Sequence, residues 1–183
     1  MRFLSATLFI ALAGTASSDE AMARAVELCM GIPFDGVPVA TTFEDGGWER
    51  MGAADFDPLV SAHACGDDGL ASGLRAQFTQ TLDFSGGLFR SGDVIALAAD
   101  NRGGDILDRI CFIAGPAQDM AQELMEALPV SADRAALGYT ARETPPENFV
   151  EAYGWRGDHQ IHVGQCGEAS AVKIRRLMRR IPQ

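Results

Sequence analysis

The chain has 183 residues, of which 47% are hydrophobic and 22% are charged, and its formal net charge at pH 7 is −10. This length predicts a single domain that is large enough to bury its own core. The acidic surplus argues against nucleic acid as a partner, because phosphates would be repelled. Beyond the N-terminus no stretch is long and apolar enough to span a membrane, so we expect no transmembrane segment.

The N-terminus has the layout of a secretory signal. One arginine precedes an apolar run from Phe3 to Ala13, and small residues follow it. This pattern is typical of a signal peptide that is cleaved after export, here after Ala16 or Ser18; an uncleaved membrane anchor is the alternative. We therefore expect a signal over residues 1–18, a mature domain over residues 19–183, and a periplasmic or secreted location.

A first helix is predicted after the signal. Ser17 and Glu20 have the spacing of a capping box, in which each side chain binds the other residue's backbone N–H. Apolar residues then recur on one helical face: Met22, Ala25, Val26, Cys29 and Met30. Gly31 is the expected end of this helix. Cys29 should therefore lie on its buried face.

The next segments give weaker signals. The stretch "VATTFEDGGWERM" predicts two short strands around the turn at Asp45-Gly46-Gly47. Asp57-Pro58 predicts a short helix over residues 59–64. Leucine and phenylalanine residues four apart predict a further helix over residues 70–82.

A hairpin and a helix are predicted in the middle of the chain. Two β-rich runs, Asp93–Ala98 and Leu107–Ala114, flank a turn rich in Asp, Asn and Gly. Pro116 then opens a helix that Pro129 ends.

In the C-terminal third, two segments fit either a helix or a strand. The stretch "TPPENFVEAYG", residues 144–154, predicts a short helix, with a strand as the alternative. The alternation in "HQIHVGQC" indicates a strand. The last segment fits either a strand over residues 171–175 or a basic amphipathic helix. Together these elements predict an α+β fold, with a small antiparallel sheet and helices packed mainly on one face.

Four cysteines in an exported chain predict two disulfides. Cys111, on a central strand, should face the underside of the first helix, where Cys29 points. We therefore prefer Cys29–Cys111 with Cys65–Cys166. The sequential pairing, Cys29–Cys65 with Cys111–Cys166, is the second possibility.

The stretch "GDHQIHVGQCG" raises the question of a metal site. His159, His162 and Cys166 would share a face only on a helix, and the glycines around them oppose a helix. On a strand His159 points one way, while His162 and Cys166 point the other. With only His63 and Cys65 left to contribute ligands, we predict no metal site and no cofactor.

"IHVGQCG" also resembles the histidine strand of NlpC/P60-type cell-wall peptidases. That resemblance implies a cysteine hydrolase in which Cys65 is the nucleophile and His162 the base. The chain departs from the family at Gly66-Asp67-Asp68, because two acids beside the thiol would raise its pKa instead of lowering it. The hydrolase is therefore the alternative, and we assign no catalytic residue.

Basic and aromatic residues suggest two further surfaces. Five bases end the chain: Lys173, Arg175, Arg176, Arg179 and Arg180. They predict a solvated tail near the protein's own acidic face, with weak contact to an anionic surface as the alternative. Trp48 and Trp155, with Phe149 and Tyr153, fit a ligand pocket or the core, and a domain of this size favours the core.

The chain resembles small exported bacterial proteins of unknown function in three features. These are a helix that ends in a cysteine, a cysteine-bearing strand that leads into a helix, and a terminal β pair with "HVG". The resemblance covers about half the chain and implies no activity. We expect a non-catalytic binding or interaction module for an unknown protein or small-molecule partner.

Overall fold

The computed structural model describes residues 17–31, 37–52, 86–103, 106–128 and 149–179. Its helices are α1 (Ser18–Gly31), α2 (Val39–Asp45) and α5 (Gln118–Ala127). Its strands are β1 (Glu49–Met51), β2 (Gly87–Ser91), β3 (Val94–Gly103), β4 (Ile106–Gly115), β5 (Phe149–Arg156), β6 (His159–Cys166) and β7 (Ala169–Arg179).

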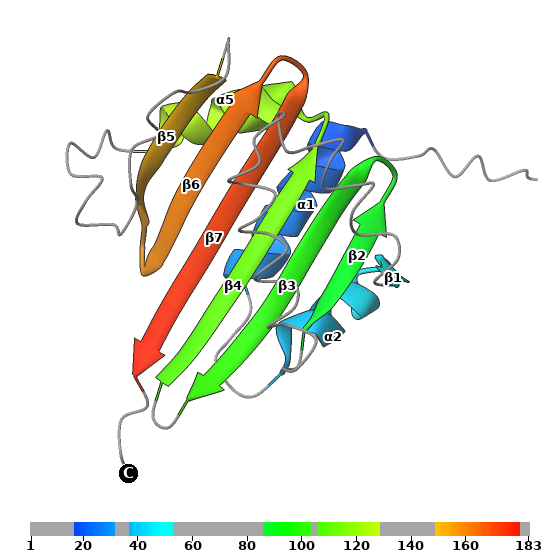
Figure 1. Ribbon diagram of the computed structural model, residues 1–183, viewed down its shortest axis with the longest axis vertical. Coiled ribbons are helices and arrows are strands. Elements are labelled where there is room, and N and C mark those ends of the chain that lie inside the picture. Colours follow the sequence, from blue (N-terminus) through cyan, green and yellow to red (C-terminus); the bar gives the residue numbers. More distant parts are fainter. Residues whose placement is uncertain (1–16, 32–36, 53–85, 104–105, 129–148, 180–183) are drawn as a thin grey trace, which may run out of the picture.

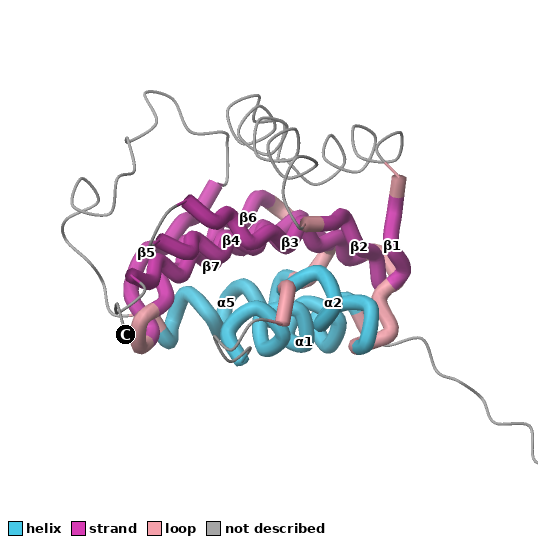
Figure 2. The backbone as a smooth tube through the Cα atoms, turned by 90° about the horizontal axis from the view of Figure 1, so that it is seen from below, coloured by secondary structure: helices cyan, strands magenta, loops and turns pink. Residues whose placement is uncertain are grey.

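The seven strands form one antiparallel sheet in the order β1-β2-β3-β4-β7-β6-β5 (Figure 1). The three described helices all lie against one face of this sheet (Figure 2). We call this the helix face and the opposite one the open face. The predicted α+β class, with helices on one face of an antiparallel sheet, is confirmed in the part of the chain that the structure describes. None of the helices in these ranges is long and apolar enough to cross a membrane.

Helix α1 forms as its sequence predicts. The Ser17 hydroxyl accepts the Glu20 N–H at 3.2 Å, and the Glu20 carboxylate accepts the Ser17 N–H at 3.1 Å, so the capping box is present. The predicted apolar face is buried up to Cys29, which lies on it, and Met30 is partly buried. Asp19 also caps the neighbouring helix, because its Oδ1 accepts the Met120 N–H of α5 at 2.9 Å.

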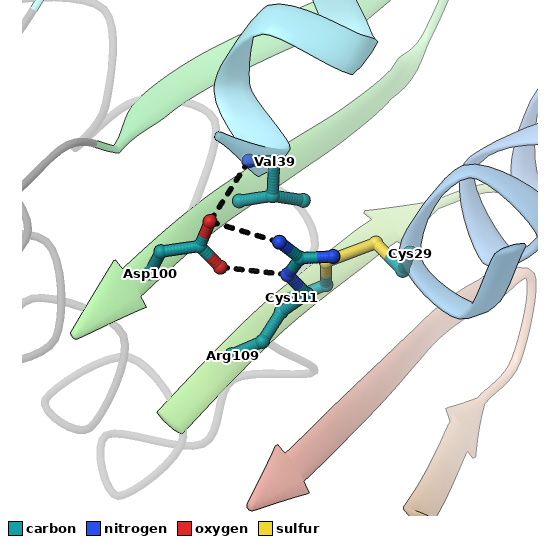
Figure 3. Close-up of a disulfide and its surroundings, with 5 residues drawn as sticks. All are labelled: Cys29, Val39, Asp100, Arg109 and Cys111. Carbon is teal, nitrogen blue, oxygen red and sulfur yellow. Dashed lines mark hydrogen bonds and ion pairs between the residues drawn. A yellow bond between two sulfur atoms is a disulfide. The ribbon is translucent and has the colours of Figure 1, made fainter. Parts of the chain in front are cut away.

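Cys29 of α1 and Cys111 of β4 form a disulfide (Figure 3). The bridge confirms the first half of the preferred pairing and shows that the sequential pairing is wrong. Cys65 lies outside the described residues, so the second bridge, Cys65–Cys166, stays a prediction. The described cysteines thus give one disulfide where two are predicted for the whole chain.

The first strand predicted in "VATTFEDGGWERM" is wrong, because Val39–Asp45 is helix α2. β-branched Val39, Thr41 and Thr42 favour a strand locally, but burial decides the outcome. Val39, Ala40 and Phe43, at helical spacing, are all buried. The turn is correct: Gly47 has φ +80°, a conformation that suits glycine, and β1 follows it. The helices predicted over residues 59–64 and 70–82 lie outside the described residues.

The middle hairpin is confirmed. β3 and β4 pair from Ile95↔Ala114 to Gly103↔Ile106, so both strands are longer than predicted. The helix predicted from Pro116 is also confirmed, and it begins two residues later, at Gln118. Ala121 and Leu124 form the centre of its buried stripe.

The C-terminal third is a three-stranded meander. Over residues 149–154 the predicted helix is wrong and its strand alternative is correct, because Phe149 opens strand β5. The strand in "HQIHVGQC" is confirmed as β6. For the last segment the strand alternative over residues 171–175 is confirmed and the amphipathic helix is wrong: Ala169–Arg179 forms β7, the longest described strand, which pairs with β4 on one side and with β6 on the other.

Candidate functional site

Strand alternation separates the two histidines of β6, as the sequence predicts. His159 points to the helix face together with Ile161 and Val163, and all three are buried. His162 lies on the open face, where its register partner on β7 is Lys173. Among the described residues no three His, Cys, Asp or Glu side chains come close enough to hold a metal ion. His63 and Cys65 lie outside these residues.

The helix face carries a row of charged residues across four adjacent strands. Asp100 pairs with Arg109, Arg109 with Arg176, and Arg176 with His159 in the strand register. Arg109 donates to both Asp100 oxygens, from Nε at 2.7 Å and from Nη2 at 3.0 Å (Figure 3). Both side chains are almost fully buried, so this is an interior ion pair.

That ion pair fixes the start of helix α2. The Val39 N–H donates to Asp100 Oδ2 at 3.0 Å, and Arg109 Nη2 donates to the Val37 carbonyl at 3.2 Å. Asp100 therefore places a negative charge at the helix N-terminus, where the helix dipole favours it. Because Cys111 is two residues from Arg109, the disulfide and the ion pair anchor α1 and α2 to the same part of the sheet (Figure 3). We interpret the pair as structural.

His159 is the third buried titratable group of the row. Its Nδ1 lies 3.0 Å from Asp158 Oδ1, while the other oxygen of Asp158 accepts a hydrogen bond from Arg176 Nε at 2.6 Å. Burial lowers the pKa of His159; Arg176 and Arg109 lower it further, and Asp158 opposes them. The ring is therefore neutral near pH 7. Its Nε2 is buried without a hydrogen-bond partner.

The open face over β5, β6 and β7 carries a different set of side chains. Two cross-strand rows are defined by the register: Trp155, Gln160 and Arg175 in one, and His162, Lys173 and Phe112 in the other. Leu177 follows Arg175 on the same face of β7. We call the following residues the open-face patch: Trp155, Gln160, His162, Lys173, Arg175 and Leu177.

The two cations of the patch are held by neighbours on β4. Arg175 donates to both oxygens of Asp108, from Nε at 2.9 Å and from Nη2 at 2.7 Å, and its side chain is still 40% exposed. The Lys173 Nζ lies 5.2 Å from the centre of the Phe112 ring. Burial lowers the pKa of Lys173, Arg175 lowers it further, and Asp108 raises it.

The open face differs between its two halves. Over β3, Ile95 and Leu97 are 4% and 3% exposed. Over β5 and β7, Trp155 is 48% exposed and Leu177 is 58% exposed. Tryptophan and arginine are also the residue types enriched at the binding hot spots of protein interfaces.

Four members of this patch, Trp155, His162, Lys173 and Arg175, were identified separately in the sequence, and one of them, Trp155, was assigned to the core. The core assignment holds for Trp48, which is 5% exposed and meets the Phe43 ring edge-on. It is wrong for Trp155. The five bases of the predicted tail are divided by strand alternation, which places Arg176 on the helix face. Side-chain alternation in the three consecutive strands β5, β6 and β7 places the patch members on one face, but it does not predict their exposure.

Comparisons with protein-family models, with curated proteins and with solved structures each found no match.

Proposed function

We propose that the chain is an exported, non-catalytic binding module that contacts its partner through the open-face patch. One observation carries the proposal: Trp155 and Leu177 are about half exposed on a face whose other half is buried. Between them Arg175 is held by Asp108 with its side chain 40% exposed. Tryptophan and arginine are the residue types that contribute most to binding energy at interfaces. A module of this kind needs no cofactor.

Export is the second part of the proposal. It is supported by the signal-like sequence of residues 1–18 and by the disulfide between Cys29 and Cys111. Disulfides persist in oxidising compartments and are rare in the cytosol. A periplasmic or secreted location follows from this proposal.

The cysteine hydrolase gains no support from the described residues. His162, its proposed base, lies across from Lys173 in the strand register. A base that accepts a proton becomes a cation, and a neighbouring lysine opposes that charge. Cys65, the proposed nucleophile, lies outside the described residues.

Site-specific photocrosslinking in the organism that makes the protein tests the proposed surface. Trp155→p-benzoylphenylalanine places the probe in the patch, and Glu123→p-benzoylphenylalanine places it on the exposed side of α5. We expect a discrete crosslinked adduct from position 155 and none from position 123. No adduct at 155, or equal adducts at both positions, would refute binding through this face.

A further inference from the structure

We infer that the open-face patch docks an extended, acidic segment of a partner protein, an inference that rests on the proposed binding function. The charge of the chain is segregated between its two layers. The three described helices hold eight acidic residues and one arginine. β7 holds four basic residues and no acid, and two of the four are paired with acids of neighbouring segments, Arg175 with Asp108 and Arg176 with Asp158. An acidic partner is therefore repelled by the helix layer and attracted to the strand layer.

The spacing along β7 specifies the shape of the segment. Lys173, Arg175 and Leu177 alternate with residues of the helix face, so successive members lie about 6.6 Å apart. A partner chain in the extended conformation repeats its own side chains at the same interval. Carboxylates at alternate positions of the partner chain therefore lie over Lys173 and Arg175. An apolar side chain two residues further along the partner lies over Leu177. Trp155, in the row of Arg175, supplies an apolar wall beside the second carboxylate.

The net charge of −10 does not prevent this docking at physiological salt. At about 0.15 M the Debye length is about 8 Å, so acids elsewhere on the molecule are screened from the patch. Contacts with Lys173 and Arg175 are made at shorter range and are screened less. The same argument predicts that binding weakens when salt is raised well above this value.

The test is an NMR titration of the full mature protein with an end-capped peptide, Leu-Ser-Glu-Ser-Glu-Ser-Leu. The peptide carries the apolar residue at both ends, so either chain direction satisfies the spacing. We expect saturable shifts of the amides of β6 and β7 and of the indole N–H of Trp155, which is distinct from that of the buried Trp48. The isomer Leu-Ser-Ser-Glu-Glu-Ser-Leu has the same composition without the alternation, and it should bind several-fold more weakly.

Matched variants assign the binding to the patch. The double variant Lys173→Gln/Arg175→Gln should bind the alternating peptide about tenfold more weakly. Arg24→Gln/Arg90→Gln makes the same change in net charge at exposed positions outside the patch and should leave the dissociation constant within about twofold. Because Arg175 also pairs with Asp108, Trp155→Ala provides a second variant that keeps this pair, and it too should weaken binding. Thermal unfolding confirms that each variant is folded.

Three outcomes overturn the inference. The first is no shift with the alternating peptide at millimolar concentration. The second is equal binding of the two isomers. The third is a protein that does not bind the peptide but sediments with phosphatidylglycerol vesicles, and does so only when Trp155 is present. That result assigns the patch to a membrane surface. If the crosslink at position 155 persists in any of these cases, the patch still binds a partner, and only the acidic segment is wrong.

Discussion

Asp100 and Arg109 form an ion pair in the interior of the molecule, with side chains 0% and 4% exposed. Such a pair contributes little net stability, because removing two charges from water offsets their attraction. Its effect lies in specificity: the Asp100 carboxylate is also the acceptor for the first N–H of α2. Loss of one partner leaves the other buried without compensation.

We therefore predict that Arg109→Met lowers the free energy of unfolding by about 3–5 kcal/mol, measured by urea denaturation followed by circular dichroism. Asp100→Asn combined with Arg109→Met should recover part of this loss, since the amide is neutral and still accepts the Val39 N–H. The control is Arg50→Met, which removes an exposed pair with Glu44 and should cost less than about 1 kcal/mol. Equal losses in Arg109→Met and Arg50→Met would contradict the interior role.

His159 predicts a dependence of stability on pH. Its folded pKa is lowered from the ordinary value of 6.5, chiefly by burial. Above that value the ring is neutral in both the folded and the unfolded state. As the pH falls below 6.5 the unfolded chain takes up the proton first, so stability declines until the lowered folded pKa is reached. The groups that face the ring are Asp158, Arg176 and Arg109.

The variant His159→Gln removes this titration. Relative to it, the wild-type protein should lose stability between pH 7.5 and pH 5, measured as the difference in free energy of unfolding at each pH. His162→Gln, on the open face, serves as the parallel variant and should leave the decline in place. If the difference in free energy of unfolding between wild type and His159→Gln does not change with pH, burial of His159 does not lower stability at low pH.

At the scale of elements, the capping box of α1 bears on where the signal is cleaved. Ser17 and Glu20 exchange two hydrogen bonds at the start of the helix. If the proposed signal is cleaved after Ala16 this box is kept, whereas cleavage after Ser18 removes its first residue. We therefore predict that the mature chain begins at Ser17, and the intact mass of the mature protein checks this.

Ser17→Ala should lower the free energy of unfolding by about 1 kcal/mol, because it removes the acceptor for the Glu20 N–H. Ser18→Ala, one position into the helix, is the matched substitution and should change stability by a few tenths of a kcal/mol. Thermal unfolding of both variants provides the comparison. A larger loss for Ser18→Ala would mean that the cap does not act through the Ser17 hydroxyl.

The elements that the sequence predicts well are those whose periodicity and end signals agree. In α1 the capping box, the apolar stripe and Gly31 all indicate one helix, and the structure has it. In α2, β-branched residues indicate a strand, and contacts of Phe43 with Trp48 and Phe89 override them. The contact with Phe89 joins segments 46 residues apart, so local sequence does not contain it.

The same distinction applies to the candidate site. Alternation within β6 is enough to predict that His159 and His162 point to opposite faces. The exposure of Trp155 depends on which face of the sheet the described helices cover and on β5 being the last strand in the order. The pair between Arg175 and Asp108, 67 residues apart, depends on β4 lying beside β7. Strand order is set by the whole fold, which explains why local sequence does not predict the exposed patch.

At the scale of the molecule, the chain shows a repeated arrangement without a repeated sequence. Helix α1 is followed by the meander β2-β3-β4, and helix α5 is followed by the meander β5-β6-β7. The two meanders join through the antiparallel pair of β4 and β7 at the centre of the sheet. Among the described residues, a disulfide joins helix and meander only in the first half, which consists of α1 and β2-β3-β4. The first half is therefore tied covalently, and the described part of the second half is held by packing and ion pairs.

The contribution of that disulfide can be measured against the second, predicted bridge. Cys29 and Cys111 are 82 residues apart, and restricting a loop of this length in the unfolded chain stabilises the fold by about 4.5 kcal/mol. Cys29→Ala/Cys111→Ala should lose most of this in urea denaturation, with α1 exchanging its amide hydrogens before α5. Cys65→Ala/Cys166→Ala is the matched variant. If that bridge exists, this variant should lose stability, but the amide hydrogens of α1 should not exchange early. Peptide mapping without reductant should yield the Cys29–Cys111 and Cys65–Cys166 pairs; a Cys29–Cys65 peptide would contradict the structure, because it cannot coexist with the bridge to β4.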